Sequence, residues 1–263
     1  DPDMPCTISY SVATNLVENI RRAVNSYYGR TNSTNAEAEM QYTLQYSTLY
    51  SWNSSTMPQY NCYAYALGRS SACNPGDFSG QSYNDKANIS TVANLVKDDL
   101  RGQLSRSCVK TQTTRPSSTT GWGNVIAVRK DTTGDYYGFN DYHFAKLSSS
   151  SWYHKPGPTG ILKFNSAPSN SVNWTNECYN GTYHEPSIWY ESSIIYLLYK
   201  SNHGSTSYTW TGNDYHSGSR HYYQYGYKCN DCGIFTSTTW TNKTCSGPPC
   251  ITPWSITPEP EES

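Results

Sequence analysis

The stretch YNCYAYALG, residues 60–68, places one cysteine at the start of a short run of alanine and tyrosine. Asn61 is a favoured helix N-cap, and Gly68 is a favoured residue just beyond a helix end. The pattern therefore predicts a short helix whose first residue is Cys62. A thiol in a first turn lies among unpartnered backbone N–H groups that stabilise its thiolate and could also receive an oxyanion. Cys62 is a candidate nucleophile; the alternative is a buried structural cysteine.

Further helices and strands are expected on both sides of this segment. Apolar spacing predicts one helix over 13–29 and a second from Ser90, as N-cap, to a stop at Gly102. Alternating patterns predict strands over 108–113, 124–130, 142–147, 152–155, 187–200 and 221–228. Helices followed by antiparallel strands indicate an α+β fold.

Two histidines occupy neighbouring predicted strands. In a hairpin with an even-numbered loop, paired residue numbers sum to an odd value, as those of His143 and His154 do. Their side chains would then face the same side, about 5–8 Å apart. His143 could take the proton of Cys62 while His154 holds its ring. An odd loop or a bulge would break this geometry. Asp141 is a competing orienting carboxylate, although we favour solvation of the turn as its role.

Three blocks in this order, YNCYAYALG (60–68), DYHFAKL (141–147) and WYHKPG (152–157), resemble the signature of secreted bacterial papain-like amidases and peptidases of the NlpC and CHAP type. The resemblance covers residues 55–165. It implies helices packed on an antiparallel sheet, with Cys62 as nucleophile, His143 as general base and acid, and His154 as the orienting residue. The Gly-Asp pair of these families appears here as GWGNV (121–125), without the aspartate.

The resemblance implies a secreted cysteine hydrolase that cleaves peptide-type amide bonds by acyl transfer, with peptide or peptidoglycan-type substrates. Such chemistry needs no metal or organic cofactor. The alternative is a non-catalytic secreted binding module, in which the papain-like scaffold is kept and the tyrosine-rich C-terminal part makes the contacts.

Composition argues against several classes of partner. The formal net charge of -1 gives no electrostatic basis for binding nucleic acid, and no apolar run approaches the roughly 20 residues of a membrane span. Only 15% of residues are charged, whereas 25 are tyrosines and nine are cysteines. This composition favours an extracellular protein, expected to be a monomer, whose export signal has been removed.

The sequence predicts three segments. These are a papain-like catalytic domain over 1–165, an aromatic-rich β module over 166–255 and a disordered acidic tail over 256–263. An odd number of cysteines leaves one thiol if the others are paired or metal-bound, and Cys62 is the candidate. A disulfide between Cys62 and Cys73 would remove it.

A cluster of four cysteines in the β module has C-x2-C-x12-C-x4-C spacing. Its members are Cys229, Cys232, Cys245 and Cys250. Four thiolates can hold a structural zinc ion, and His216 or His221 could replace one of them. Two disulfides are an equal alternative in an exported protein. Trp210 and the tyrosines near it form a candidate aromatic surface for wall glycans or peptides.

Overall fold

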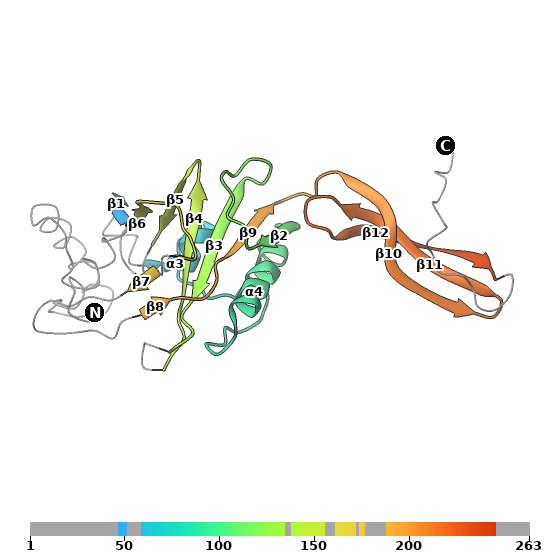
Figure 1. Cartoon of the computed structure of the whole chain (residues 1–263), viewed down its shortest axis with the longest axis horizontal. Coiled ribbons are helices and arrows are strands. Elements are labelled where there is room, and N and C mark those ends of the chain that lie inside the picture. The colour runs from blue at the N-terminus through green and yellow to red at the C-terminus, as the bar shows by residue number, and fades with distance from the viewer. Residues whose placement is uncertain are drawn as a thin grey trace, which may run out of the picture. The chain divides into compact units, whose positions relative to one another are not determined.

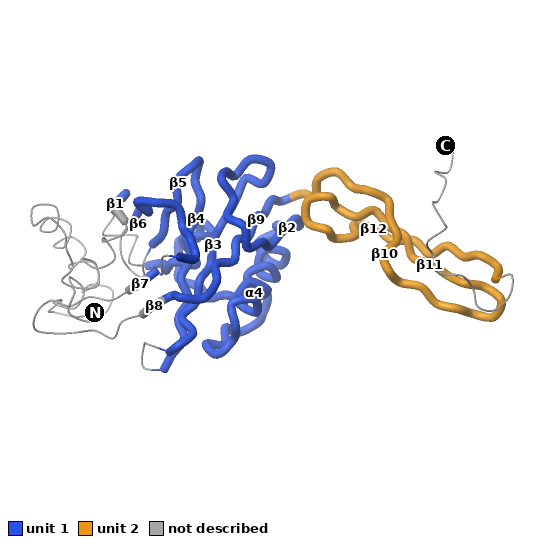
Figure 2. Tube along the Cα trace, viewed as in Figure 1, with its two compact units in different colours: residues 1–201 blue, residues 202–263 orange. Residues whose placement is uncertain are grey.

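The structure is a computed structural model that describes residues 47–51, 59–134, 138–155, 161–171, 174–176 and 188–245. The chain divides into two compact units, Asp1–Ser201 and Asn202–Ser263 (Figure 2). The predicted helix over 13–29 and the predicted tail over 256–263 lie outside the described residues.

Seven antiparallel strands make up the main sheet of the first unit, in the order β1-β6-β5-β4-β3-β9-β2 (Figure 1). Their bounds are β1 Ser47–Ser51, β2 Cys108–Gln112, β3 Asn124–Lys130, β4 Tyr142–Ser148, β5 Ser151–His154, β6 Ile161–Phe164 and β9 Ile195–Lys200. A smaller sheet pairs β7 (Trp174–Asn176) with β8 (Ile188–Tyr190). Because β9 lies between β3 and β2, the first unit extends to residue 201, and the predicted domain boundary at 165 is wrong.

Helix α3, Cys62–Leu67, has the bounds that the sequence predicts. The Asn61 side chain accepts a hydrogen bond from the Ala64 N–H (3.1 Å), which satisfies a first-turn donor. Gly68 ends the helix with a φ of 70°, a left-handed conformation that glycine adopts without steric cost. These caps explain how a stable helix of six residues forms here.

Helix α4, Ile89–Arg101, begins two residues earlier than predicted. Its N-cap is Asn88, whose side chain accepts from the Thr91 N–H (2.9 Å), whereas the sequence pattern favoured Ser90. The predicted stop at Gly102 is confirmed as the C-cap. Among the described residues, no helix is long and apolar enough to cross a membrane.

The sheet has a hydrophobic cluster on each face. On one face, Ile126 and Val128 of β3 pack with buried residues of α3 and α4, which lie on this side of the sheet. On the other face, Val125 and Ala127 of β3 pack in a cluster that includes Trp174. Burial on both faces explains why β3 reads as a continuous apolar run rather than a strict alternation.

The second unit is a three-stranded antiparallel sheet in the order β10-β11-β12. Its strands are β10 Thr206–Ser217, β11 Arg220–Cys229 and β12 Phe235–Thr244. Only β11 was predicted from its aromatic pattern. The other two strands are dominated by exposed side chains, so they lack the apolar alternation on which the prediction depended.

The α+β, papain-like fold expected from the sequence is contradicted. Within the described ranges the protein is mostly β, with twelve strands in antiparallel sheets against two helices. The α3 helix has only six residues. The expected class gave too much weight to the helical segments at the start of the chain and too little to the strands beyond residue 160.

Gly226 allows β11 and β12 to approach closely, and we expect Gly226→Ala to destabilise the second unit by about 1–3 kcal/mol, the usual cost of overpacking. A Cβ at this position would collide with the Ser237 carbonyl oxygen and lie 2.9 Å from the Phe235 and Thr238 side chains. Hydrogen exchange of β11 and β12 amides measures the effect. Thr241→Ala, an exposed change on β12, is the control and should have little effect; equal protection in both variants would contradict the prediction.

Candidate functional site

Cys62 is a buried thiol held against the strand that carries His143. Its sulfur lies 3.9 Å from the carbonyl oxygen of Tyr142, and the N–H of Phe144 also hydrogen-bonds to it. These two backbone groups flank His143 and point to the same edge of β4, because strand residues alternate in direction. The sulfur therefore lies beside His143 at that edge of the strand.

Cys62 and Cys73 both have thiol side chains, so the disulfide that would have removed the candidate nucleophile does not form. The two segments are instead joined by Asn61, whose side-chain amide donates to the Cys73 carbonyl oxygen (2.8 Å). Because the Asn61 side chain also caps α3, its polar atoms hold the local structure together.

The prediction that both histidines face the same side of the sheet is confirmed. Ser148 pairs with Ser151, which gives the hairpin an even two-residue loop, and Ala145 pairs with His154. His143 is thus the diagonal neighbour of His154 on the same face. Its Nε2 lies 2.9 Å from Nδ1 of His154, so the two rings share a hydrogen bond.

Aromatic side chains enclose the histidine pair. The His143 ring contacts Trp174 and Tyr190, with centroid distances of 5.8 Å and 5.3 Å, and His154 stacks on Phe164 at 4.2 Å. His143 is 4% exposed and His154 is 0% exposed. Among the described residues, no hydrogen bond joins the Cys62 sulfur to either ring. The structure therefore brings the two histidines together and places Cys62 beside the backbone of one of them.

Burial determines the protonation states at this site. It raises the pKa of Cys62 to about 12, with a smaller contribution from the Asp141 carboxylate. It lowers the pKa of His143 to about 3 and that of His154 well below its ordinary value. The sequence predicted a stabilised thiolate at the helix start, and this is wrong for the buried state because desolvation outweighs the favourable groups. The Cys62 thiol and the imidazoles of His143 and His154 are therefore neutral at pH 7.

Asp141 does not orient His143. Its carboxylate accepts a hydrogen bond from the Tyr190 hydroxyl (2.7 Å), and burial raises its pKa. The backbone oxygen of Asp141 accepts from the N–H of Asp131 at the end of β3. Asp141 therefore has a structural role, but its carboxylate is buried and does not solvate the turn as the sequence favoured. The side chain that hydrogen-bonds to the His143 ring is that of His154.

Sequence reasoning missed Lys155, the residue after His154. Its ammonium group donates to the carbonyl oxygen of Tyr60 and lies 4.4 Å from the centre of that ring. Lys155 is fully buried, and burial lowers its pKa to about 7, while negative charge on Cys62 would raise it. The signal was the lysine in WYHKPG, which stands on the opposite strand face from His154 and so on the side of α3.

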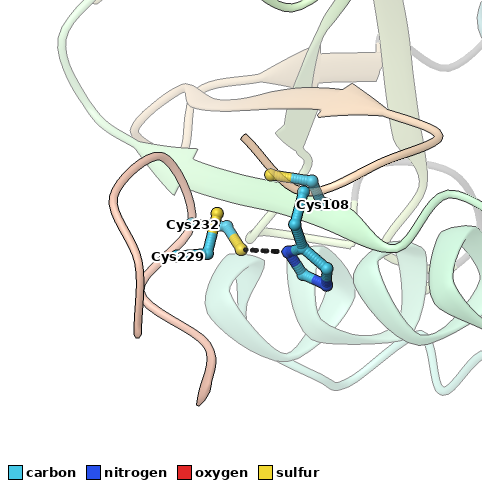
Figure 3. Close-up of side chains that lie close together, drawn as sticks. Cys108, Cys229 and Cys232 are labelled. Carbon is cyan, nitrogen blue, oxygen red and sulfur yellow. Dashed lines mark hydrogen bonds between the residues drawn. The ribbon is translucent and has the colours of Figure 1, made fainter. Parts of the chain in front are cut away.

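A second group of chemically active side chains involves Cys229 and Cys232 (Figure 3). Its members in the second unit are His203, Cys229 and Cys232; each offers one nitrogen or sulfur atom, and these atoms all lie within 4.8 Å of one another. The Cys232 sulfur is 3.3 Å from Nδ1 of His203, the contact dashed in Figure 3. Two thiols and one imidazole are ligands of the kind that bind zinc.

The Cys229 thiol has an acidic pKa. Burial would raise that pKa, but backbone N–H groups of Cys232 and Asp231 donate to the sulfur, His203 adds a side-chain hydrogen bond, and the pKa falls to about 6. Cys229 is therefore largely a thiolate at neutral pH.

The predicted set of four C-terminal cysteines does not assemble. Cys245 is disulfide-bonded, to a partner outside the described residues, and Cys250 also lies outside them. The N–H of Cys245 bonds to the carbonyl of Ser219, at the end of the β11–β12 ladder remote from Cys229. Ten strand residues separate these ends by about 33 Å. His216 and His221 contact each other near the Cys245 end.

Two groups are thus chemically distinctive in the described structure. The Cys62 group consists of Cys62, His143, His154 and Lys155, and the Cys229 group consists of His203, Cys229 and Cys232. The first has a thiol, two neutral imidazoles and a buried lysine, which suit proton transfer and nucleophilic attack. The second has soft ligands, which suit a metal ion. No family model, curated protein or solved structure matches this chain significantly.

Proposed function

We propose that this chain is a cysteine hydrolase that cleaves peptide-type amide bonds, with Cys62 as nucleophile, His143 as base and His154 as the orienting residue. The observation that carries the proposal is the 2.9 Å contact between His143 Nε2 and His154 Nδ1. The Cys62 sulfur lies 3.9 Å from the carbonyl oxygen of Tyr142, the residue before His143 on β4. A nucleophile, a base and a third group that fixes the base are the parts that acyl transfer requires.

In the proposed mechanism, His143 donates its Nε2–H to Nδ1 of His154. Nδ1 of His143 is then the nitrogen that accepts the proton of the Cys62 thiol. Neutral thiol and imidazole in the resting site mean that proton transfer accompanies attack on the carbonyl carbon, with no ion pair formed beforehand. His143 then gives this proton to the leaving amine, and a water molecule deprotonated by the same ring releases the acid.

Burial has a consequence for access. Cys62 is 6% exposed, so a substrate can reach the sulfur only when the residues that cover it move apart. Opening also admits water and lowers the desolvation penalty on the thiolate. Lys155 would then support the thiolate, since its charge lowers the pKa of Cys62. The proposal therefore predicts slow alkylation of Cys62 in the resting protein and faster alkylation when a substrate is bound.

We expect Cys62→Ala to reduce hydrolysis by at least about a thousand-fold, because loss of a nucleophile removes the covalent route. The measurement is release of new amines from peptides and peptidoglycan-derived peptides, analysed by mass spectrometry. His143→Ala should lower hydrolysis to a similar extent, because both the attack of Cys62 and the release of the acid lose their base.

The control is Cys73→Ser, which changes another buried thiol that is not in the proposed site. This variant should keep its activity. Hydrolysis that persists in Cys62→Ala, or an acyl group found on a different residue, would refute the assignment.

A non-catalytic binding role has separate support from the second unit. Exposed aromatic side chains lie on its sheet, and Tyr215 stacks on Tyr222 (4.7 Å) and contacts Trp240 (5.0 Å). Exposed aromatic groups of this kind are typical of binding surfaces. The test is binding of the intact chain to peptidoglycan. If the chain binds it, the double variant Tyr215→Ser with Trp240→Ser does not, and no substrate is hydrolysed, this second function replaces the first.

A further inference from the structure

We propose that His203, Cys229 and Cys232 bind one zinc ion within the second unit. The three residues lie outside the Cys62 group, so this site is independent of the hydrolase proposal. It also differs from the ligand set predicted from spacing, because Cys229 and Cys232 are kept and His203 takes the place of the two later cysteines.

The three ligand atoms already lie near the distances that a zinc ion requires. They are all within 4.8 Å of one another, and the Cys232 sulfur is 3.3 Å from Nδ1 of His203. Around a tetrahedral zinc ion a sulfur and a nitrogen ligand lie about 3.5 Å apart, and two sulfurs about 3.8 Å apart. Closure around the ion therefore needs shifts of about 1 Å or less.

A tight turn after β11 presents the two cysteines. Cys229 is the last residue of β11, and its carbonyl oxygen accepts from the N–H of Gly233 (2.9 Å). The N–H of Cys229 donates to the carbonyl of Ile234 (2.8 Å), which closes the turn. Gly233 has a φ of 76°, a conformation that disfavours residues with a side chain. The turn therefore holds Cys229 and Cys232 in a fixed arrangement.

The segment that carries His203 is bonded to the same turn. The N–H of Asn230 donates to the Ser205 carbonyl (2.9 Å), and the Asn230 side chain contacts Ser205 (3.1 Å) and Ser207 (2.7 Å). These bonds keep His203 beside Cys232. The ligands are thus positioned by backbone and side-chain hydrogen bonds that do not depend on a metal.

Backbone N–H groups surround the Cys229 sulfur. Those of Asp231 and Cys232 belong to the turn, and that of Gly204 comes from the residue after His203. Such donors favour the thiolate, which is the form of cysteine that binds a metal. The Gly204 contact also ties the His203 segment to the sulfur itself.

The chemistry of the ligands selects the ion. Thiolate and imidazole favour zinc over magnesium or calcium, which take oxygen ligands. Two cysteines and one histidine are a known zinc ligand set, in which a fourth ligand from outside the set completes the tetrahedron.

Metal titration of the full chain, reduced and freed of metal with a chelator, tests the proposal. Cobalt(II) should bind at one ion per chain with thiolate-to-cobalt charge-transfer absorption, and zinc(II) should displace it. Both His203→Ala and Cys232→Ser should weaken zinc binding by more than about 100-fold, the upper end of losses caused by outer partners alone. The matched controls, His216→Ala and Cys245→Ser, alter residues of the spacing-based prediction and should bind as the unaltered chain does.

Thiol labelling of the unaltered chain keeps the test decisive if a variant fails to fold. Zinc should slow the reaction of Cys229 and Cys232 with N-ethylmaleimide and leave that of Cys73 unchanged. Cobalt spectra without thiolate bands, or formation of a Cys229–Cys232 disulfide in place of metal binding, would overturn the proposal. Loss of binding in Cys245→Ser together with full binding in His203→Ala would overturn the ligand assignment.

Discussion

Acidification from pH 7 to pH 4.5 is expected to cost the first unit about 3 kcal/mol of unfolding free energy from His143 alone, and buried His154 adds to this loss. Burial lowers the pKa of His143 to about 3 and that of His154 well below its ordinary value. The unfolded chain, in which a histidine titrates near pH 6.5, therefore binds protons before the folded chain does.

The sign follows from this order of protonation. The stabilising contribution is complete above about pH 6.5, and it is lost as the pH falls toward the folded pKa, at about 1.4 kcal/mol per pH unit for each histidine. The hydrogen bond between the rings does not prevent this loss, because the cost arises from placing charge in an aromatic enclosure.

Hydrogen exchange of β3 and β4 amides, corrected for the intrinsic rate at each pH, measures the unfolding free energy of this unit separately from the second unit. The double variant His143→Gln with His154→Gln should show a much flatter dependence between pH 6.5 and pH 4.5. His216→Gln, an exposed histidine in the second unit, should leave it unchanged. An equally steep loss in the double variant would assign acid sensitivity to other groups.

Removal of the Asp99 carboxylate should have an effect of similar size at neutral pH. Asp99 is a fully buried residue of α4 whose oxygens accept hydrogen bonds from the Tyr63 hydroxyl (2.7 Å), the Gly76 N–H (2.7 Å) and the Ser79 hydroxyl (2.9 Å). Asp99→Ala leaves buried donors without an acceptor, and hydrogen bonds to charged groups contribute about 1.5–3 kcal/mol each. We expect a loss of at least about 3 kcal/mol in the first unit.

Tyr63 makes this prediction specific. Burial raises the pKa of Tyr63, and the nearby Asp99 raises it further, so its hydroxyl remains a donor at all ordinary pH values. Tyr63→Phe removes this donor, so Asp99→Ala should cost less in that background than alone. Urea unfolding followed by hydrogen exchange tests the cycle. Asp98→Ala changes an exposed neighbour and should alter the free energy of unfolding by less than about 0.5 kcal/mol. If the losses from Tyr63→Phe and Asp99→Ala simply add in the double variant, the two side chains do not stabilise the unit through their contact.

Local signals predicted the elements whose ends depend on a few neighbouring residues. Asn61 and Gly68 bound α3 because one side chain satisfies a first-turn N–H and the other residue adopts a left-handed φ. Asn88 and Ser90 are both favoured N-cap residues. The sequence pattern favours Ser90 as the N-cap of α4, whereas the helix uses Asn88.

Long-range pairing explains the larger errors. β9 inserts between β3 and β2, so the first unit ends at residue 201, and no local pattern near residue 165 reports this. Likewise, β12 separates Cys245 from Cys229 by its full length, although a zinc motif was predicted from the spacing. Spacing limits how far apart residues can lie, but strand pairing decides where they do lie.

The sequence by itself determined the start and end of the Cys62 helix and the shared face of His143 and His154, because caps and hairpin parity are properties of adjacent residues. Only the tertiary structure decided that the Cys62 thiol and the histidines are neutral, and that Cys229 and Cys232 lie close to His203. Protonation depends on desolvation by the whole fold, and ligand assembly depends on contacts between segments that are far apart along the chain.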